Sequence, residues 1–223
     1  GARDKGVHRY QLRGNTAGCF ADFDQAFSVA NIPSLSALSE AVGMTVSGDQ
    51  LIVKDRERIM VWPNYLSAPS GASGKSVYNP GARLSFAVDE KNRLWTTYLH
   101  TGHLMLYQLY PNLAPQLVRQ ELSLYWKDNP TVEVEYSMRE TGPEFDPTTN
   151  TLWINDRDHN RILRVSNYDE YSKKLLVDLV IGQPNKTSVQ CNHNQQYDWT
   201  AKGAPSADSL CDVGRIEFDR LGN

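Results

Sequence analysis

Short apolar stretches alternate with polar turns along most of the chain. The stretches that begin at Leu51, Leu94 and Leu152 are rich in β-branched and aromatic residues, and Asp, Asn, Gly and Pro residues flank them. Such stretches favour half-buried, pleated surfaces, and their flanks favour turns. Residues 112–126 have some helical periodicity, but Pro115 interrupts it early, so we expect strands there too. The pattern predicts an all-β protein.

The apolar stretches belong to an internal repeat. Three segments share a strand, a polar turn and a second alternating strand: DQLIVKDRERIMVW at 49–62, NRLWTTYLHTGHLMLY at 92–107 and TLWINDRDHNRILRV at 151–165. An apolar strand that ends in a turn precedes each segment, and a fourth copy of that opening, IEFDRLGN, lies at 216–223. Successive copies are 43 and 58 residues apart. The shorter interval is close to the length of a propeller blade, about 40–45 residues.

The repeat therefore predicts a β-propeller of four-stranded blades. We expect a single domain over residues 1–223, with blades at about 32–80, 81–142 and 143–213 and a further blade that starts at 214. One repeat cannot bury its apolar face alone, so blades pack side by side around an axis. About three blades plus the start of another form an incomplete ring, because propellers close with about four to eight. We expect either a fragment or a ring completed by another polypeptide.

The turns of the repeat resemble those of the bacterial NHL-repeat β-propeller family. That family combines a D-x-x-G-N turn, a strand of the L-x-V-A-D type and a polar N-N-R turn. Residues 219–223 match the first turn closely, and residues 155–161 resemble the second half. The middle copy departs most, with Tyr98 in place of the aspartate and His103 in place of the arginine. The resemblance implies a propeller fold, and protein or glycan partners more than chemistry.

The cysteines bear on the cellular location. LVDLVIGQP at 176–184 and the stretch from Cys191 to Cys211 resemble the long connector of exported family members. A disulfide between these two cysteines, 20 residues apart, would contribute about 3 kcal/mol by the chain-entropy argument. Two or three reduced, buried thiols are the alternative. Ser39 occupies the place of Cys211 in the first connector, which leaves Cys19 without an equivalent partner. The disulfide implies an extracellular or cell-envelope location.

Few residues suggest chemistry. His100 and His103 form an H-x-x-H stretch that could hold a metal, but no third ligand accompanies them, so we favour a polar turn. Asp55 and Asp156 recur at one repeat position, which favours a structural role in turns over catalysis. Asn185 begins an N-glycosylation sequon of a kind that is common by chance. We assign no catalytic, cofactor-binding or metal-binding residue.

Composition and charge narrow the range of partners. The chain has 23 basic and 26 acidic residues and a net charge of −3, so no basic excess favours nucleic acid. No apolar run approaches the roughly 18 residues of a membrane span, and we expect no transmembrane segment. Tyr197 and Trp199 lie in the long connector, outside the strand pattern. They are a candidate binding surface, although they could instead cover their own loop.

These features predict an exported propeller without enzymatic activity, which serves as a binding or scaffolding module for a protein or glycan partner. The first alternative is a metal-dependent lactonase or lyase-type propeller whose site is completed by missing blades. The second is a structural subunit of a larger extracellular assembly. A native mass measurement that finds a stable multichain particle would favour the assembly. Elemental analysis that finds a tightly held metal would favour the enzyme.

Overall fold

The protein is all-β throughout the residues that the structure describes. The computed structural model describes residues 7–15, 18–27, 41–55, 58–67, 74–78, 86–98, 101–111, 113–138, 141–191, 209–218 and 222. Within these ranges the helical elements are two single 3₁₀ turns, η1 (Arg157–His159) and η2 (Tyr168–Glu170). No helix of the described part has the length and apolar character to cross a membrane.

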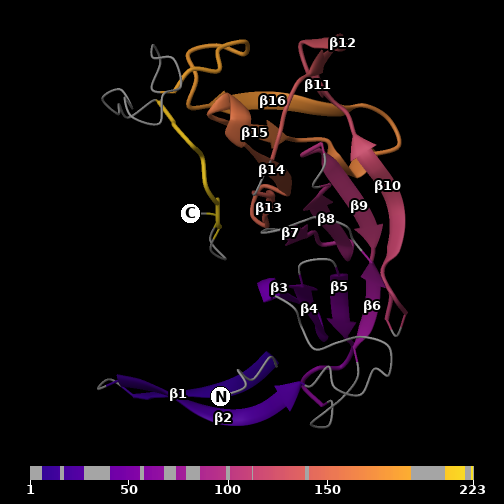
Figure 1. The fold of residues 1–223 in the computed structure, drawn as a ribbon, viewed down its shortest axis with the longest axis vertical. Helices are drawn as coiled ribbons and strands as arrows, with labels where there is room; N and C mark the ends of the chain where they lie inside the picture. Colours follow the sequence, from indigo (N-terminus) through magenta and orange to yellow (C-terminus); the bar gives the residue numbers. More distant parts are fainter. Residues whose placement is uncertain are drawn as a thin grey trace.

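Three sets of four antiparallel strands follow one another along the chain, each paired in chain order (Figure 1). The first sheet contains β3 (Ala41–Ser47), β4 (Gln50–Asp55), β5 (Arg58–Trp62) and β6 (Lys75–Tyr78). The second sheet contains β7 (Phe86–Val88), β8 (Arg93–Thr97), β9 (Leu104–Gln108) and β10 (Gln116–Leu122). The third sheet contains β13 (Pro143–Asp146), β14 (Thr151–Asp156), β15 (Arg161–Val165) and β16 (Leu175–Ile181).

The three sheets have equivalent registers. Leu51, Leu94 and Leu152 are each the second residue of the second strand in their sheet. Each pairs with an apolar or aromatic residue of the third strand, namely Trp62, Tyr107 and Val165. The repeat in the sequence thus corresponds to a repeat of sheet structure.

The sheets are arranged as a fan. Strand β7 contacts both β3 and β13, so the first strands of successive sheets lie next to one another. Figure 1 shows these three strands at the inner ends of their sheets, with the later strands fanning outward from them. A separate hairpin of β1 (Val7–Asn15) and β2 (Gly18–Phe27) lies at one end of the fan.

Two apolar cores fill the spaces between neighbouring sheets. The core between the first and second sheets contains Ile52, Ile59, Val61, Phe86, Leu94, Met105, Tyr107 and Leu109. The core between the second and third sheets is larger and includes Trp95, Leu104, Leu106, Leu152, Ile154, Leu163 and Val165. Since alternate residues of a strand face opposite sides, the second sheet contributes one face to each core.

A further hairpin links the outer edges of the second and third sheets. It consists of β11 (Leu124–Trp126) and β12 (Asn129–Val134), and β11 pairs in parallel with β16. The sequence places these residues with the second repeat, whereas their hydrogen bonds extend the third sheet to six strands. The strands expected within residues 112–126 are present as β10 and β11.

The turns between first and second strands depend on aspartates. Asp89 Oδ1 accepts the backbone amides of Lys91 at 2.9 Å and Arg93 at 3.0 Å. Asp146 Oδ1 accepts the amide of Thr148 at 2.9 Å. Burial alone would raise the pKa of Asp146, but hydrogen bonds from Thr149 and Thr148 hold that pKa below its ordinary value. These carboxylates satisfy turn amides.

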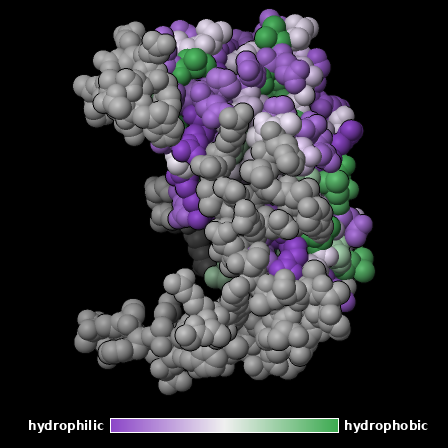
Figure 2. Space-filling view, in the orientation of Figure 1, coloured by the Kyte–Doolittle hydropathy of each residue, from purple (hydrophilic) through white to green (hydrophobic). Residues whose placement is uncertain are grey.

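The visible described surface is mostly hydrophilic. Figure 2 shows hydrophobic patches along the edge of the molecule where β10 runs. In this region Leu113 is 56% exposed and Leu117 is 49% exposed. Scattered apolar residues of this kind are ordinary on protein surfaces.

Candidate functional site

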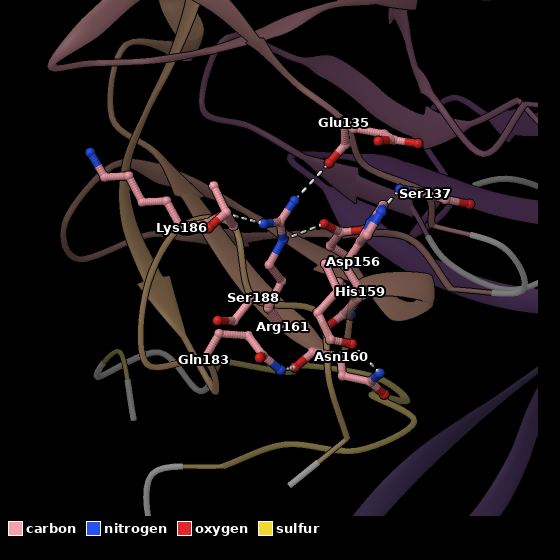
Figure 3. Close-up of polar contacts among 12 residues, drawn as sticks. Glu135, Ser137, Asp156, His159, Asn160, Arg161, Gln183, Lys186 and Ser188 are labelled. Carbon is pink, nitrogen blue, oxygen red and sulfur yellow. Dashed lines mark hydrogen bonds and ion pairs between the residues drawn. The ribbon is translucent and has the colours of Figure 1, made fainter. Parts of the chain in front are cut away.

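A buried ion pair begins a polar cluster at one end of the third sheet (Figure 3). Strand β14 ends at Asp156, β15 begins at Arg161, and Arg161 Nε donates to Asp156 Oδ2 at 2.6 Å. The other carboxylate oxygen, Oδ1, accepts the amide of Ser137 at 2.8 Å and lies 2.7 Å from His159 Nδ1. Three partners therefore surround a fully buried carboxylate. This arrangement fixes local structure, because buried charge must be paired.

Arg161 extends the cluster to two other segments. Its Nη1 donates to the carbonyl of Lys186 at 2.6 Å, and its Nη2 donates to the carbonyl of Glu135 at 2.7 Å. The guanidinium carbon lies 5.7 Å from the centre of the Trp126 ring. A planar, permanently charged guanidinium suits this role because its donors point in fixed directions. Arg161 ties β15 to the segments before β13 and after β16.

Asn160 links the turn to both sides of the Cys191–Cys211 connector. Its φ of 52° is left-handed, a conformation that asparagine tolerates better than most residues. Asn160 Nδ2 donates to the carbonyl of Val189 at 2.9 Å, and Asn160 Oδ1 accepts the amide of Asp212 at 2.8 Å. Its own carbonyl accepts from Gln183 Nε2 at 2.8 Å. One residue thus contacts the chain before and after the connector.

A disulfide joins Cys191 to Cys211, as the sequence predicts. Just after it, Asp212 Oδ1 accepts from Arg157 Nε at 2.8 Å, which adds an ion pair to the same turn. Gly182, with φ of 90°, approaches Leu210 so closely that a Cβ would lie 2.5 Å from that side chain. We call residues 182–191 and 209–212 the anchored base. It holds both ends of the stretch between the cysteines.

The disulfide is expected to contribute substantially to stability. Replacing both Cys191 and Cys211 by serine should lower the free energy of unfolding by about 3 kcal/mol, because the unfolded chain regains the freedom of a closed loop. Urea unfolding followed by circular dichroism measures this change. The unmodified chain in excess reductant should match the double variant, and equal stability with and without the disulfide would contradict the prediction.

The two predicted aromatic contact residues belong to the stretch that the base holds. Tyr197 and Trp199 lie between the two cysteines, in 192–208, outside the described residues. Their role as a binding surface stays a prediction. What the described residues establish is that the chain enters and leaves this stretch at fixed positions.

The repeated aspartates have equivalent partners. Asp55 ends β4 as Asp156 ends β14, and Asp55 Oδ2 accepts from Arg58 Nε at 3.1 Å. The middle copy has Tyr98 in place of the aspartate, and beside it the Tyr136 hydroxyl accepts the amide of Leu104 at 2.9 Å. Burial raises the pKa of Tyr136, so its hydroxyl stays protonated. Tyr136 thus accepts a main-chain amide at the start of β9.

The H-x-x-H stretch is described only in part. His103 immediately precedes β9, its carbonyl accepts the amide of Tyr98 at 2.7 Å, and its ring lies 4.9 Å from that of Tyr136. His100 lies outside the described residues. Among the residues with a described placement, no group of three or more His, Cys, Asp or Glu side chains could hold a metal ion.

The sequon lies on the anchored base. Asn185 is exposed, and its Oδ1 accepts the amides of Thr187 at 3.0 Å and Ser188 at 2.9 Å. These bonds form a tight turn of the type that asparagine favours. The side chain therefore has a clear structural role in shaping the base.

Sequence reasoning missed most of the residues that build the base. Gln183, Asn160 and Asp212 act through backbone amides and carbonyls, and such contacts need no particular spacing along the chain. One available signal was the Asn160-Arg161 pair, which resembles the polar N-N-R turn of NHL repeats. Gln183 and Asp212 belong to no comparable local pattern.

A half-buried carboxyl, that of Glu144, lies on β13, the innermost strand of the third sheet. Burial raises the pKa of Glu144 from 4.5 to about 7; Arg215 opposes the rise and Glu217 adds to it. Between these two pH values the folded chain holds a proton that the unfolded chain has released. Its stabilising contribution is therefore complete below pH 4.5 and is lost as the pH rises through about 7.

Glu144→Gln is expected to remove this pH dependence. At about pH 8 the variant should be more stable than the unmodified chain by about 1–3 kcal/mol, because no half-buried carboxyl has to be charged. Urea unfolding at about pH 4 and pH 8 measures the difference. Glu170→Gln, at an exposed position, is the matched control and should change stability little at either pH. An identical pH dependence in Glu144→Gln and the unmodified chain would refute the assignment.

Comparison with known proteins leaves the family open. No protein-family model matches the chain, and no curated protein matches it. The resemblance to NHL repeats therefore remains a hypothesis that rests on the turns and the repeated sheets.

Proposed function

We propose that this chain is a section of an NHL-type β-propeller that acts outside the cytoplasm as a non-enzymatic binding or scaffolding module. The fold supports the first part of the proposal. Three consecutive sets of four antiparallel strands, with their first strands in contact, are what successive blades around one axis require. The proposed partner is a protein or a glycan.

The observation that carries the binding proposal is the anchored base. The disulfide, the Arg157–Asp212 ion pair and the contacts of Asn160 hold the two ends of the 192–208 stretch on the third sheet. A contact surface presented from a rigid support loses less conformational entropy when it binds. Tyr197 and Trp199, aromatic residues within that stretch, are the proposed contacts.

Two further observations fit this reading. Asp156, the most buried acid of the cluster, is surrounded by donors that hold the fold together, which favours a structural role. The Cys191–Cys211 disulfide favours an oxidising location, since such bonds persist there and are rare in reducing compartments. The proposed location is extracellular or in the cell envelope.

Glycan-array binding and affinity measurements test the proposal. Any glycan bound by the unmodified chain should lose at least about tenfold in affinity for Tyr197→Ala/Trp199→Ala, equivalent to about 1.4 kcal/mol. Tyr110→Ala is the control, because Tyr110 is an exposed tyrosine that follows β9 in the second sheet. The Tyr110→Ala variant should bind the glycan as tightly as the unmodified chain. Hydrolysis of lactones that requires Ca²⁺ or Zn²⁺ and stops on chelation would overturn the proposal in favour of an enzyme.

A further inference from the structure

The third sheet has one face that points away from the second sheet. On this side Trp153 pairs with Glu144 and Arg164, and Arg164 pairs with Leu179. Residues opposite one another in neighbouring antiparallel strands share a face. We call the following set the outward face: Glu144, Trp153, Ile162, Arg164, Leu179 and Ile181.

The outward face is apolar in its outer part and poorly covered. Leu179 is 36% exposed and Ile181 is 41% exposed, and Trp153 and Ile162 are only partly buried. On the opposite face of the same sheet, Leu152, Ile154, Leu163 and Val165 each have 0% exposure and belong to the core shared with the second sheet. Burial of the outward face would remove apolar surface from water.

The two preceding sheets bury the equivalent face. At the position of Trp153, the second sheet has Trp95 and the first sheet has Ile52, each with 0% exposure. Trp95 belongs to the core shared with the third sheet, and Ile52 belongs to the core shared with the second. In both cases the next sheet along the chain provides the cover.

The chain places an extended segment on the outward face. The Phe218 ring lies 5.7 Å from the Trp153 ring, and the charges of Arg215 and Glu217 act on the carboxyl of Glu144. Farther along, Gly222 approaches Thr148 so closely that a Cβ would lie 2.2 Å from its hydroxyl oxygen. The segment therefore follows β13 and the turn after it.

This segment has the register of a first strand. In the repeat, Phe218 occupies the position of Val88 and Phe145. Val88 packs against the core between the first and second sheets, and Phe145 packs against the core between the second and third. Phe218 makes the corresponding contact with the outward face.

We propose that the outward face is an interface for a fourth antiparallel sheet of the same repeat, whose first strand is residues 215–218. The inference deepens the proposed function and rests on its propeller architecture. The occupant presents an apolar side, since the second sheet meets the first through Leu94, Met105 and Tyr107. The continuity of the segment with the chain, and its repeat register, identify this occupant.

Hydroxyl-radical footprinting of an extended chain tests the interface. The full chain is joined after Asn223 to a second copy of residues 93–122, which contains β8, β9 and β10. Labelling of Leu179, Ile181 and Trp153 should slow by at least about fivefold relative to the unextended chain. An extension with the same residues in scrambled order is the matched control and should leave the labelling unchanged.

Three outcomes would overturn the proposal. They are unchanged labelling with the repeat extension, equal protection by the scrambled extension, and self-association of the unextended chain that Trp153→Arg abolishes. The last result, seen by sedimentation, would make a second copy the occupant. Glycan binding reports separately on the proposed function, because Tyr197 and Trp199 are not part of the outward face. Binding without protection removes only this inference, and protection without binding removes only the binding proposal.

Discussion

Asp156→Ala is expected to lower the free energy of unfolding by about 3–5 kcal/mol, because it leaves the Arg161 guanidinium buried without its carboxylate. The amide of Ser137 loses its acceptor in the same change. Chemical denaturation followed by fluorescence and circular dichroism measures the loss. If the contacts of the turn support the anchored base, limited proteolysis between Cys191 and Cys211 should also become faster.

Two further variants distinguish the buried Asp156–Arg161 ion pair from an ion pair that is partly exposed. Asp178 pairs with Arg164 at 2.8 Å, but Arg164 is 32% exposed, so Asp178→Ala should cost about 1 kcal/mol or less. Replacing both partners, as Asp156→Leu/Arg161→Met, should cost less than Asp156→Ala alone, since no unpaired charge remains. Equal losses for Asp156→Ala and Asp178→Ala would contradict the role of burial.

Trp95→Ala is expected to destabilise the chain by about 3–5 kcal/mol, the range for truncating a large buried aromatic residue. Trp95 is fully buried between the second and third sheets, and its Nε1 donates to Asp89 Oδ2 at 2.8 Å. The substitution opens a cavity in the larger core and removes a bond that supports the turn aspartate. Urea denaturation gives the change in unfolding free energy.

The equivalent residue of the third sheet is the natural control. Trp153 has the same register as Trp95 but lies on the outward face, where it is only partly buried. Trp153→Ala should therefore cost about 1–2 kcal/mol, since less surface returns to water. A loss as large as that of Trp95→Ala would mean that the described segment 215–218 already covers this face fully.

The strands were predictable where the local pattern is strong. Leu51, Leu94 and Leu152 begin apolar stretches between turn residues, and this short-range pattern was sufficient to place equivalent strands. The pairing of the hairpin at residues 124–134 with β16 was not predictable, because it is parallel and joins residues about 50 positions apart. No local periodicity encodes such a partner.

The candidate site was predictable only at its covalent link. Cysteines 191 and 211 stand out as residue types, and the resemblance to an exported connector indicated their pairing. Asn160 and Gln183 recognise main-chain groups, which every residue carries, so the sequence offers no complementary residue type to search for. The hydrogen bond from the Leu104 amide to Tyr136 was equally hidden, since the two residues lie 32 positions apart.

The β11–β12 hairpin connects the second and third sheets at their outer edges. The chain leaves β10, the outer strand of the second sheet, and continues directly into β11. Strand β11 pairs with β16, the outer of the four strands of the third set. Splaying these two sheets apart would require shearing a row of main-chain hydrogen bonds as well as exposing the core beneath. A force applied to one of these sheets is therefore transmitted to the other. We expect the two sheets to unfold together in a pulling experiment.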